Sequence, residues 1–307
     1  MLWWNKSTLG NWALAIASSL CSLGFFNGSS AQASAAAGMA SSKAALAYPI
    51  SFQAIAQTPA TYATFQEWCE AQERLEADAQ HTVAVLMEEL NAQDCQQAGQ
   101  SAALRTLLNL SSQELVDLSP LGAFPLMREL VLHNNDISDI TPLASLTQLA
   151  RLYLSNNQIT DLSPLADLEN LRFLVLIDNE IADLTGLSRL SGLQELYLNN
   201  NQIADLSPLV NLMELTKLYL SRNQIVDVSP LNGLTRLQVL DLSSNQIENL
   251  VPLATLTNLE QLNLNRNQIY ETTPLRALGN LEEIYLYNNP VREAGCPTTT
   301  SNAICFI

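Results

Sequence analysis

A pattern of the form Leu-x-Leu-x-x-Asn-x-Ile recurs along the chain at a constant interval. Clear copies begin at Leu130, Leu152 and Leu174, and the same step continues to the last copy, which runs from Ile284 to Val291. A degenerate copy from Leu108 to Leu115, with Gln113 in place of the asparagine, precedes them, which makes nine copies without an insertion. A constant interval of this length is typical of a solenoid, in which each repeat contacts only its neighbours.

The two leucines of each Leu-x-Leu predict a short strand with both side chains in the core, because side chains alternate with a period of two along a strand. We expect the strands to stack in parallel, one per repeat. The asparagine is interpreted as a turn residue whose amide satisfies backbone groups where the chain leaves the strand. Stacked copies would form a structural asparagine ladder, made of Asn135, Asn157, Asn179, Asn201, Asn223, Asn245, Asn267 and Asn289.

The return half of each repeat reads Asp-Leu-Ser-Pro-Leu or a close variant, as in Asp161 to Leu165. Serine or threonine before proline predicts a helix start, with the hydroxyl as the cap and proline at the first position. We therefore expect a short helical turn, of the 3₁₀ kind, on the convex side. The column of acidic and amide residues that opens this half is interpreted as turn and dipole stabilisation rather than as a cation site. It consists of Asp117, Asp139, Asp161, Asp183, Asp205, Asp227, Asn249 and Glu271.

These repeats resemble the 22-residue class of leucine-rich repeats found in bacterial internalins and in a eukaryotic phosphatase regulator. The resemblance covers the whole repeat region, 104–291. It implies an α/β repeat fold: a leucine-rich-repeat solenoid with a parallel concave sheet, short helical turns on the convex side and a helical N-terminal cap. The segments around Trp68-Cys69 and Asp94-Cys95, with Ile304-Cys305-Phe306 at the other end, are similar to exported cyanobacterial repeat proteins with cysteine-bearing caps. The resemblance implies the fold and not the partner.

The segment 1–33 has the layout of a secretory signal peptide. Lys6 is the cation before an apolar, uncharged run from Trp12 to Phe26, and the small-x-small site Ala31 to Ala33 follows. We expect cleavage after Ala33 and no membrane span afterwards, because the run is shorter than the about 20 residues that a bilayer requires. An uncleaved membrane anchor is the alternative.

Between this leader and the repeats we expect two segments. Residues 34–61 are rich in Ala, Ser and Gln and predict a flexible linker. Residues 62–103 predict a helical N-terminal cap, because Val83, Leu86, Met87 and Leu90 fall at helical spacing. Such a cap would cover the exposed end of the core of the repeats at 104–291, and residues 292–307 would form the C-terminal cap.

Four cysteines would remain after cleavage: Cys69, Cys95, Cys296 and Cys305. An even number in an exported chain indicates disulfides. Two lie before the repeats and two after them, and a bond between opposite ends of a long solenoid is excluded because the Cα atoms must approach within about 7 Å. We therefore predict a Cys69–Cys95 and a Cys296–Cys305 disulfide. No metal site is expected, because the chain has no Cys-x-x-Cys pair and only two histidines.

The net charge and the absence of catalytic motifs argue against several classes of function. The net charge of -16 disfavours nucleic acid and anionic membranes as partners. We find no nucleophile elbow, phosphate loop or metal motif, and His133 near Glu129 and Asp136 forms no recognisable triad. The sequence therefore predicts neither catalysis nor a cofactor.

A candidate binding surface lies at the solvent-facing positions of the strands. In one repeat Phe173, Val175 and Ile177 would make an apolar stripe on the concave side, flanked by tyrosines and rimmed by charges, a pattern typical of a binding hot spot. The whole candidate set is Arg151, Tyr153, Phe173, Val175, Ile177, Glu195, Tyr197, Lys217 and Tyr219. The alternative is that tyrosine is the usual filler of these positions and that this repeat has drifted.

Together these features predict an exported binding module, secreted or held in the periplasm or cell envelope, that recognises a protein or glycan ligand. Two alternatives are an intracellular scaffold similar to the phosphatase regulator and a structural envelope protein. The sequence does not indicate an oligomeric state.

Overall fold

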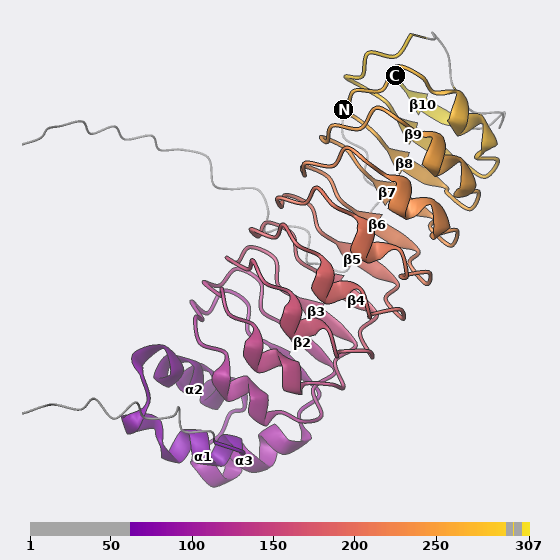
Figure 1. Ribbon diagram of the computed structural model, residues 1–307. Helices are drawn as coiled ribbons and strands as arrows, with labels where there is room; N and C mark the ends of the chain where they lie inside the picture. Colours follow the sequence, from indigo (N-terminus) through magenta and orange to yellow (C-terminus); the bar gives the residue numbers. More distant parts are fainter. Residues whose placement is uncertain (1–61, 293–296, 298–302) are drawn as a thin grey trace, which may run out of the picture. The chain divides into compact units, whose positions relative to one another are not determined.

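The computed structural model describes residues 62–292, 297 and 303–307. Within them, ten short strands form one parallel sheet, in which each strand pairs with the next along the chain (Figure 1). The strands are β1 (Leu107–Asn109), β2 (Glu129–Val131), β3 (Arg151–Tyr153), β4 (Phe173–Val175), β5 (Glu195–Tyr197), β6 (Lys217–Tyr219), β7 (Val239–Asp241), β8 (Gln261–Asn263), β9 (Glu283–Tyr285) and β10 (Ile304–Phe306). The predicted solenoid with a parallel sheet is confirmed.

The register aligns the repeats column by column. Leu108 of β1 pairs with Leu130 of β2, and the same column continues through every strand to Ile284 of β9. These side chains are almost fully buried, as is the second leucine of each Leu-x-Leu. Burial of an aliphatic side chain contributes about 1.5–3 kcal/mol, so the leucine columns are the main stabilising element of the array.

The first eight repeats return through a short 3₁₀ helix on the side of the core opposite the sheet (Figure 1). These helices are η2 (Ser119–Ala123), η3 (Thr141–Ser145), η4 (Ser163–Leu165), η5 (Thr185–Leu187), η6 (Ser207–Leu209), η7 (Ser229–Gly233), η8 (Val251–Thr255) and η9 (Thr273–Ala277).

The predicted hydroxyl cap of these helices is wrong. In η6, Ser207 is the first helical residue, Leu206 precedes it as the N-cap, and no side chain caps the helix. The carboxylate of Asp205 instead accepts a 2.8 Å hydrogen bond from the Ser207 backbone N–H. The acidic column thus satisfies the backbone N–H of the first helical residue. The same bond is made by every member of the column from Asp117 to Glu271.

The buried asparagines join adjacent repeats through their amides. The Asn201 Nδ2 donates to the carbonyls of Leu176 (2.9 Å) and Leu198 (3.1 Å), and its Oδ1 accepts from the Ile181 N–H (3.1 Å). Equivalent bonds recur at the other asparagines of the series. Each amide therefore pairs backbone groups of two successive repeats that are buried from water.

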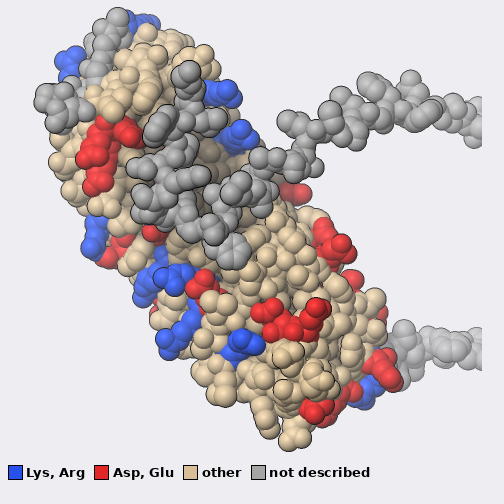
Figure 2. All heavy atoms as spheres, turned by 180° about the vertical axis from the view of Figure 1, so that it is seen from behind, with Lys and Arg blue, Asp and Glu red and all other residues tan. Residues whose placement is uncertain are grey.

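Charged side chains are scattered over the visible surface. On the face shown in Figure 2, acidic and basic side chains lie in small separate groups with uncharged surface between them. The excess of acidic residues in the chain is therefore not gathered into a single patch on this face.

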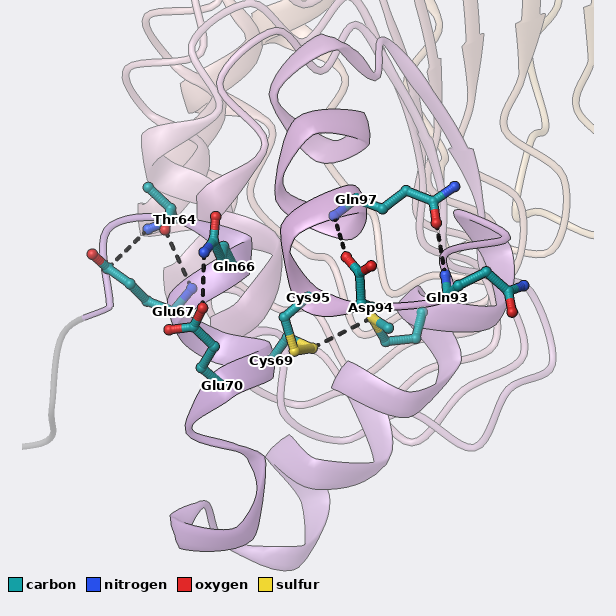
Figure 3. Close-up of a disulfide and its surroundings, with 10 residues drawn as sticks. Thr64, Gln66, Glu67, Cys69, Glu70, Gln93, Asp94, Cys95 and Gln97 are labelled. Carbon is teal, nitrogen blue, oxygen red and sulfur yellow. Dashed lines mark hydrogen bonds between the residues drawn. A yellow bond between two sulfur atoms is a disulfide. The ribbon is translucent and has the colours of Figure 1, made fainter.

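Three α-helices precede the sheet: α1 (Phe65–Glu70), α2 (Ala77–Glu89) and α3 (Cys95–Leu104), with a 3₁₀ turn η1 (Gln72–Arg74) between the first two. Thr64 and Glu67 form a capping box that begins α1. The predicted disulfide between Cys69 and Cys95 is confirmed and joins α1 to the start of α3, with 5.4 Å between the Cα atoms (Figure 3).

These helices pack against the first repeat. The ring of Phe65 lies 5.4 Å from that of Phe124, and the Thr82 hydroxyl donates a 2.7 Å hydrogen bond to the Asp117 carbonyl. Val83, Leu86 and Leu90, the core of the predicted apolar stripe, are buried. The contacts close the end of the leucine core that β1 would otherwise expose.

The strand β10 at the other end was not predicted. It pairs with β9, and Phe306 stacks on Tyr285 with 4.6 Å between ring centroids. Cys305 is disulfide-bonded. Cys296 lies outside the described residues, so its pairing with Cys305 stays a prediction.

The predicted signal peptide (1–33) and linker (34–61) also lie outside the described residues. Of the helices in the described part of the chain, none combines the length and the apolar character that crossing a membrane requires.

Candidate ligand-binding face

The candidate residues project from the sheet on the side away from the leucine core. We define the sheet face as the first and third residues of each strand, which alternate with the buried leucine between them. Eight of the nine candidate residues occupy such positions in β3 to β6. Ile177 is the exception, because it follows β4 in the loop.

Four aromatic rings on this face form a continuous row across four successive repeats. We call Tyr153, Phe173, Tyr197 and Tyr219 the aromatic row. Ring centroids are 5.1 Å apart between Tyr153 and Phe173, and 5.4 Å apart between Phe173 and Tyr197. Tyr197 and Tyr219 stack at 4.7 Å with planes within 8°. Contacts of this kind contribute about 0.5–1.5 kcal/mol each beyond area burial and hold the rings in fixed places.

Phe173 joins the row from a different column. In register, Val175 takes the place on β4 that Tyr153 and Tyr197 take on the neighbouring strands. The Phe173 ring, from the first position of β4, contacts both tyrosines and so closes the gap that the shorter valine leaves. The row therefore depends on one phenylalanine at its middle.

Charged pairs border the row. The Arg151 guanidinium lies 3.4 Å from the Glu129 carboxylate, and the Lys217 ammonium lies 3.2 Å from that of Glu195. Glu195 also accepts a 2.7 Å hydrogen bond from the Tyr197 hydroxyl. Because these pairs are partly exposed, each stabilises the fold by about 1 kcal/mol or less, and their role here is to fix the side chains.

The electrostatics of the face keep its tyrosines neutral. Burial raises the pKa of the Tyr153, Tyr197 and Tyr219 hydroxyls above the usual value, and the hydrogen bond to Glu195 adds to the rise at Tyr197. Burial also raises the pKa of the Asp241 carboxyl on β7 and lowers that of the His133 imidazole. The aromatic row thus presents uncharged rings with polar hydroxyl groups.

Beside the strand ends, the loops form a shallow groove of about 510 Å³ that sequence reasoning missed. Ile177 lines one end of this groove and is not part of the aromatic row. Further along, the groove is lined by Tyr287 and by six residues of three successive loops. We call the part formed by these six the arginine groove: Ser221, Arg222, Ser243, Ser244, Asn265 and Arg266. The available signal was the loop sequence, because Ser-Arg-Asn-Gln, Ser-Ser-Asn-Gln and Asn-Arg-Asn-Gln at 221–224, 243–246 and 265–268 contain two arginines and no acid.

A metal ion would be bound by a group of ligating side chains that lie close together. Among the residues that the structure describes, no group of three His, Cys, Asp or Glu side chains is placed to hold a metal ion.

The parallel strand column, the buried leucines and the asparagine ladder together define a leucine-rich-repeat solenoid. The family model of leucine-rich repeats (2 copies) matches residues 147–189, 191–233, 214–255 and 235–277.

Solved structures place the chain more narrowly. It is 30% identical to an internalin (inlF) from Listeria monocytogenes, covering 76% of this chain and 67% of that one with a TM-score of 0.67. It is 32% identical to an internalin C2 (inlC2) from the same species, covering 66% and 91% with a TM-score of 0.63. The chain belongs to the internalin-like family of leucine-rich-repeat proteins. This fold supports a protein-interaction module.

A more distant similarity is to the ectodomain of the plant receptor kinase GASSHO1/SCHENGEN3 from Arabidopsis thaliana, solved in complex with CASPARIAN STRIP INTEGRITY FACTOR 2. The identity is 27% and the TM-score 0.53, over 59% of this chain and 24% of that one. No protein of curated function matches the sequence.

Proposed function

We propose that the chain is an exported binding module that recognises a protein ligand through the aromatic row. The single observation that carries this proposal is the unbroken contact of four rings across β3 to β6. Rings held by their neighbours bury large areas at little cost in conformational entropy, and aromatic residues dominate binding hot spots.

The surroundings of the row fit the same role. Its rings are half-buried, and the pairs Arg151–Glu129 and Lys217–Glu195 place charge at its border. A polar rim around an apolar centre is the usual arrangement of a protein interface. The plant receptor ectodomain, solved in complex with another factor, offers an example of a leucine-rich-repeat protein with a bound partner.

Export is supported by the Cys69–Cys95 disulfide, since disulfides persist in oxidising compartments and are rare in the cytosol. The signal-like segment 1–33 points the same way. Intact-mass measurement of the protein from its native cell, with and without reduction, tests this part. A mass that begins at Ser34 with no free thiols is expected. A full-length mass with reactive cysteines would favour the intracellular scaffold instead.

Binding is tested by replacing Phe173 and Ile177 with glutamate. The F173E/I177E variant and the wild type are screened against purified extracellular and envelope proteins of the source cell and against a glycan array. We expect a protein to bind the wild type and to be lost in the variant, with an unchanged circular dichroism spectrum.

The matched control is V210E/V226E, which makes the same change at exposed apolar residues outside the sheet face. It should bind like the wild type. Full binding by folded F173E/I177E, or ligands found only on the glycan array, would contradict the proposal.

A further inference from the structure

The arginine groove is a local exception in an acidic chain. The protein has 30 acidic and 14 basic residues, yet the three loops that form this part of the groove contain two arginines and no aspartate or glutamate. The equivalent loop at the other end of the groove carries Asp178 and Glu180 instead. Charge along the strand ends therefore changes sign from the fourth repeat to the sixth, seventh and eighth.

The two guanidinium groups are available to a ligand. Arg222 and Arg266 are exposed, and within the described residues neither side chain has an ion pair or a hydrogen bond. Lys217, on the strand of the same repeat as Arg222, is by contrast paired with Glu195. Exposed arginines without a partner within the protein can bind the carboxylate or another anionic group of a ligand.

The backbone conformation of the repeat fixes the positions from which the two arginine side chains project. Arg222, Ser244 and Arg266 occupy the same position in successive repeats, each with a φ of 56° or 57°. Their backbone N–H groups donate to the carbonyls of Ser243, Asn265 and Tyr287 in the next repeat, at 2.7–2.9 Å. Since these three N–H groups are used within the solenoid, the arginine side chains are the groups at these positions that can donate to an anionic ligand. Left-handed backbone is unfavourable for arginine, so its recurrence here is set by the repeat and not by arginine itself.

The distance between Arg222 and Arg266 indicates how far apart two carboxylates of a ligand would have to be. Two repeats separate Arg222 from Arg266, which corresponds to about 10 Å at the distance between neighbouring strands. In an extended peptide with the polyproline II conformation, which has three residues per turn and rises about 3.1 Å per residue, side chains three positions apart lie on the same side and about 9 Å apart. A peptide lying along the groove, across the strands, would thus bring carboxylates at positions i and i+3 to the two arginines.

The groove also lies next to the aromatic row. Both are on the strand side of the array, and the groove begins at Ile177 and Asn199, in the repeats that supply Phe173 and Tyr197. One protein ligand could therefore contact the rings with apolar residues and continue into the groove with acidic ones. Ser221, Ser243 and Asn265 between the arginines offer neutral hydrogen-bonding groups to its backbone.

We infer that the arginine groove binds an extended acidic segment of the protein ligand, with two carboxylates three positions apart. This inference rests on the proposed function, because it assigns the groove to the same partner as the aromatic row.

The test uses a fluorescent peptide whose only charges are two aspartates three positions apart, and the same peptide with asparagines in their place. Binding to the full chain is followed by anisotropy at low ionic strength, where exposed charges are least screened. We expect the aspartate peptide alone to bind, and the R222Q/R266Q variant to bind it at least about tenfold more weakly, as for the loss of charged hydrogen bonds.

The matched control is R189Q/R236Q, which removes the same charge from arginines paired with Asp167 and Glu214 outside the groove. It should retain binding to within about twofold, since exposed ion pairs contribute little. Equal loss in both variants would show a general charge effect and overturn the inference. So would equal binding of the two peptides, or binding of a sulfated oligosaccharide with none of the aspartate peptide.

Failure of this inference is distinguishable from failure of the proposed function. If the native partner is lost both in F173E/I177E and in F173E alone but binds R222Q/R266Q normally, only the acidic-segment assignment is wrong. If the partner binds F173E/I177E normally, the aromatic row is not its site, whatever the peptide does.

Discussion

The Tyr197 hydroxyl donates a 2.7 Å hydrogen bond to Glu195, the residue two positions before it on β5, and Glu195 at the same time pairs with Lys217 of β6. The phenol is half-buried between Phe173 and Tyr219. Burial is the main cause that raises the pKa of Tyr197, and the bond to the carboxylate is the next. One tyrosine is thereby fixed in position and held in its neutral form.

The first prediction concerns alkaline pH. Because the folded pKa of Tyr197 lies above the unfolded value of about 10, its contribution to stability is present below that pH and is lost as the pH rises further. We expect the tyrosinate absorbance that distinguishes the wild type from Tyr197→Phe to develop only well above pH 10, together with unfolding. A difference signal that titrates near pH 10 in a chain still folded by circular dichroism would contradict this.

The second prediction concerns the asparagine ladder. Asn201→Ala removes an amide that pairs the buried carbonyls of Leu176 and Leu198 and the N–H of Ile181. The two carbonyls keep bonds from Asn179 and Asn223, so the Ile181 N–H is the group that loses its partner. An unsatisfied buried group costs about 1–3 kcal/mol, so we expect a loss of about that size in the free energy of unfolding, measured with urea. Gln202→Ala, at the exposed neighbouring position, is the control and should change stability by about 0.5 kcal/mol or less. Similar effects of the two substitutions would show that the ladder does not stabilise the array.

Much of this architecture could be predicted from the sequence because the same pattern of buried and turn residues occurs in nine successive copies. Leu-x-Leu requires a strand with a buried face, and the Cys69–Cys95 pairing follows from which cysteines share an end of the array. The hydroxyl cap failed because the helix begins at Ser207 itself and not after it, and sequence alone does not show that Asp205 accepts the Ser207 N–H.

The remaining differences have equally specific causes. β10 escaped prediction because Cys305 pairs with Ile284 at a spacing one position shorter than the repeat interval, and because no asparagine marks it. The bridging position of Phe173 depends on the size of Val175 in the next column, which periodicity does not encode. The assignment of the candidate residues to a ligand remains a proposal, since chemistry and not repetition would select that ligand.

The third prediction concerns the N-terminal helices. The Cys69–Cys95 disulfide closes a loop across a sequence separation of 26 residues. In the chain-entropy model such a bond stabilises by about 3 kcal/mol. In C69A/C95A we expect faster hydrogen exchange in α1 and α3, with the central repeats unchanged because each repeat contacts only its neighbours. Loss of protection as far as β5 would show that the cap and the array unfold as one unit.

The last prediction concerns acid. The Asp183, Asp205 and Asp227 carboxylates accept hydrogen bonds from the residue two positions later, chiefly from its hydroxyl and also from its backbone N–H, and these bonds lower their pKa. A folded pKa below the unfolded value of about 3.9 means that the stabilisation is present above that pH and is lost as the pH falls through the folded pKa. We therefore expect these carboxylates to lower the urea midpoint as the pH falls below about 4.

The triple variant D183N/D205N/D227N separates the charge from the hydrogen bond. Asparagine can still accept the backbone bond, as Asn249 does from the Val251 N–H at 3.0 Å. We expect the variant to remain folded and its urea midpoint to depend less on pH in the acid range than that of the wild type. The matched variant D183A/D205A/D227A, which lacks both charge and acceptor, should be less stable at neutral pH as well. If the asparagine variant followed the wild-type acid curve, the column would not be the source of the acid sensitivity.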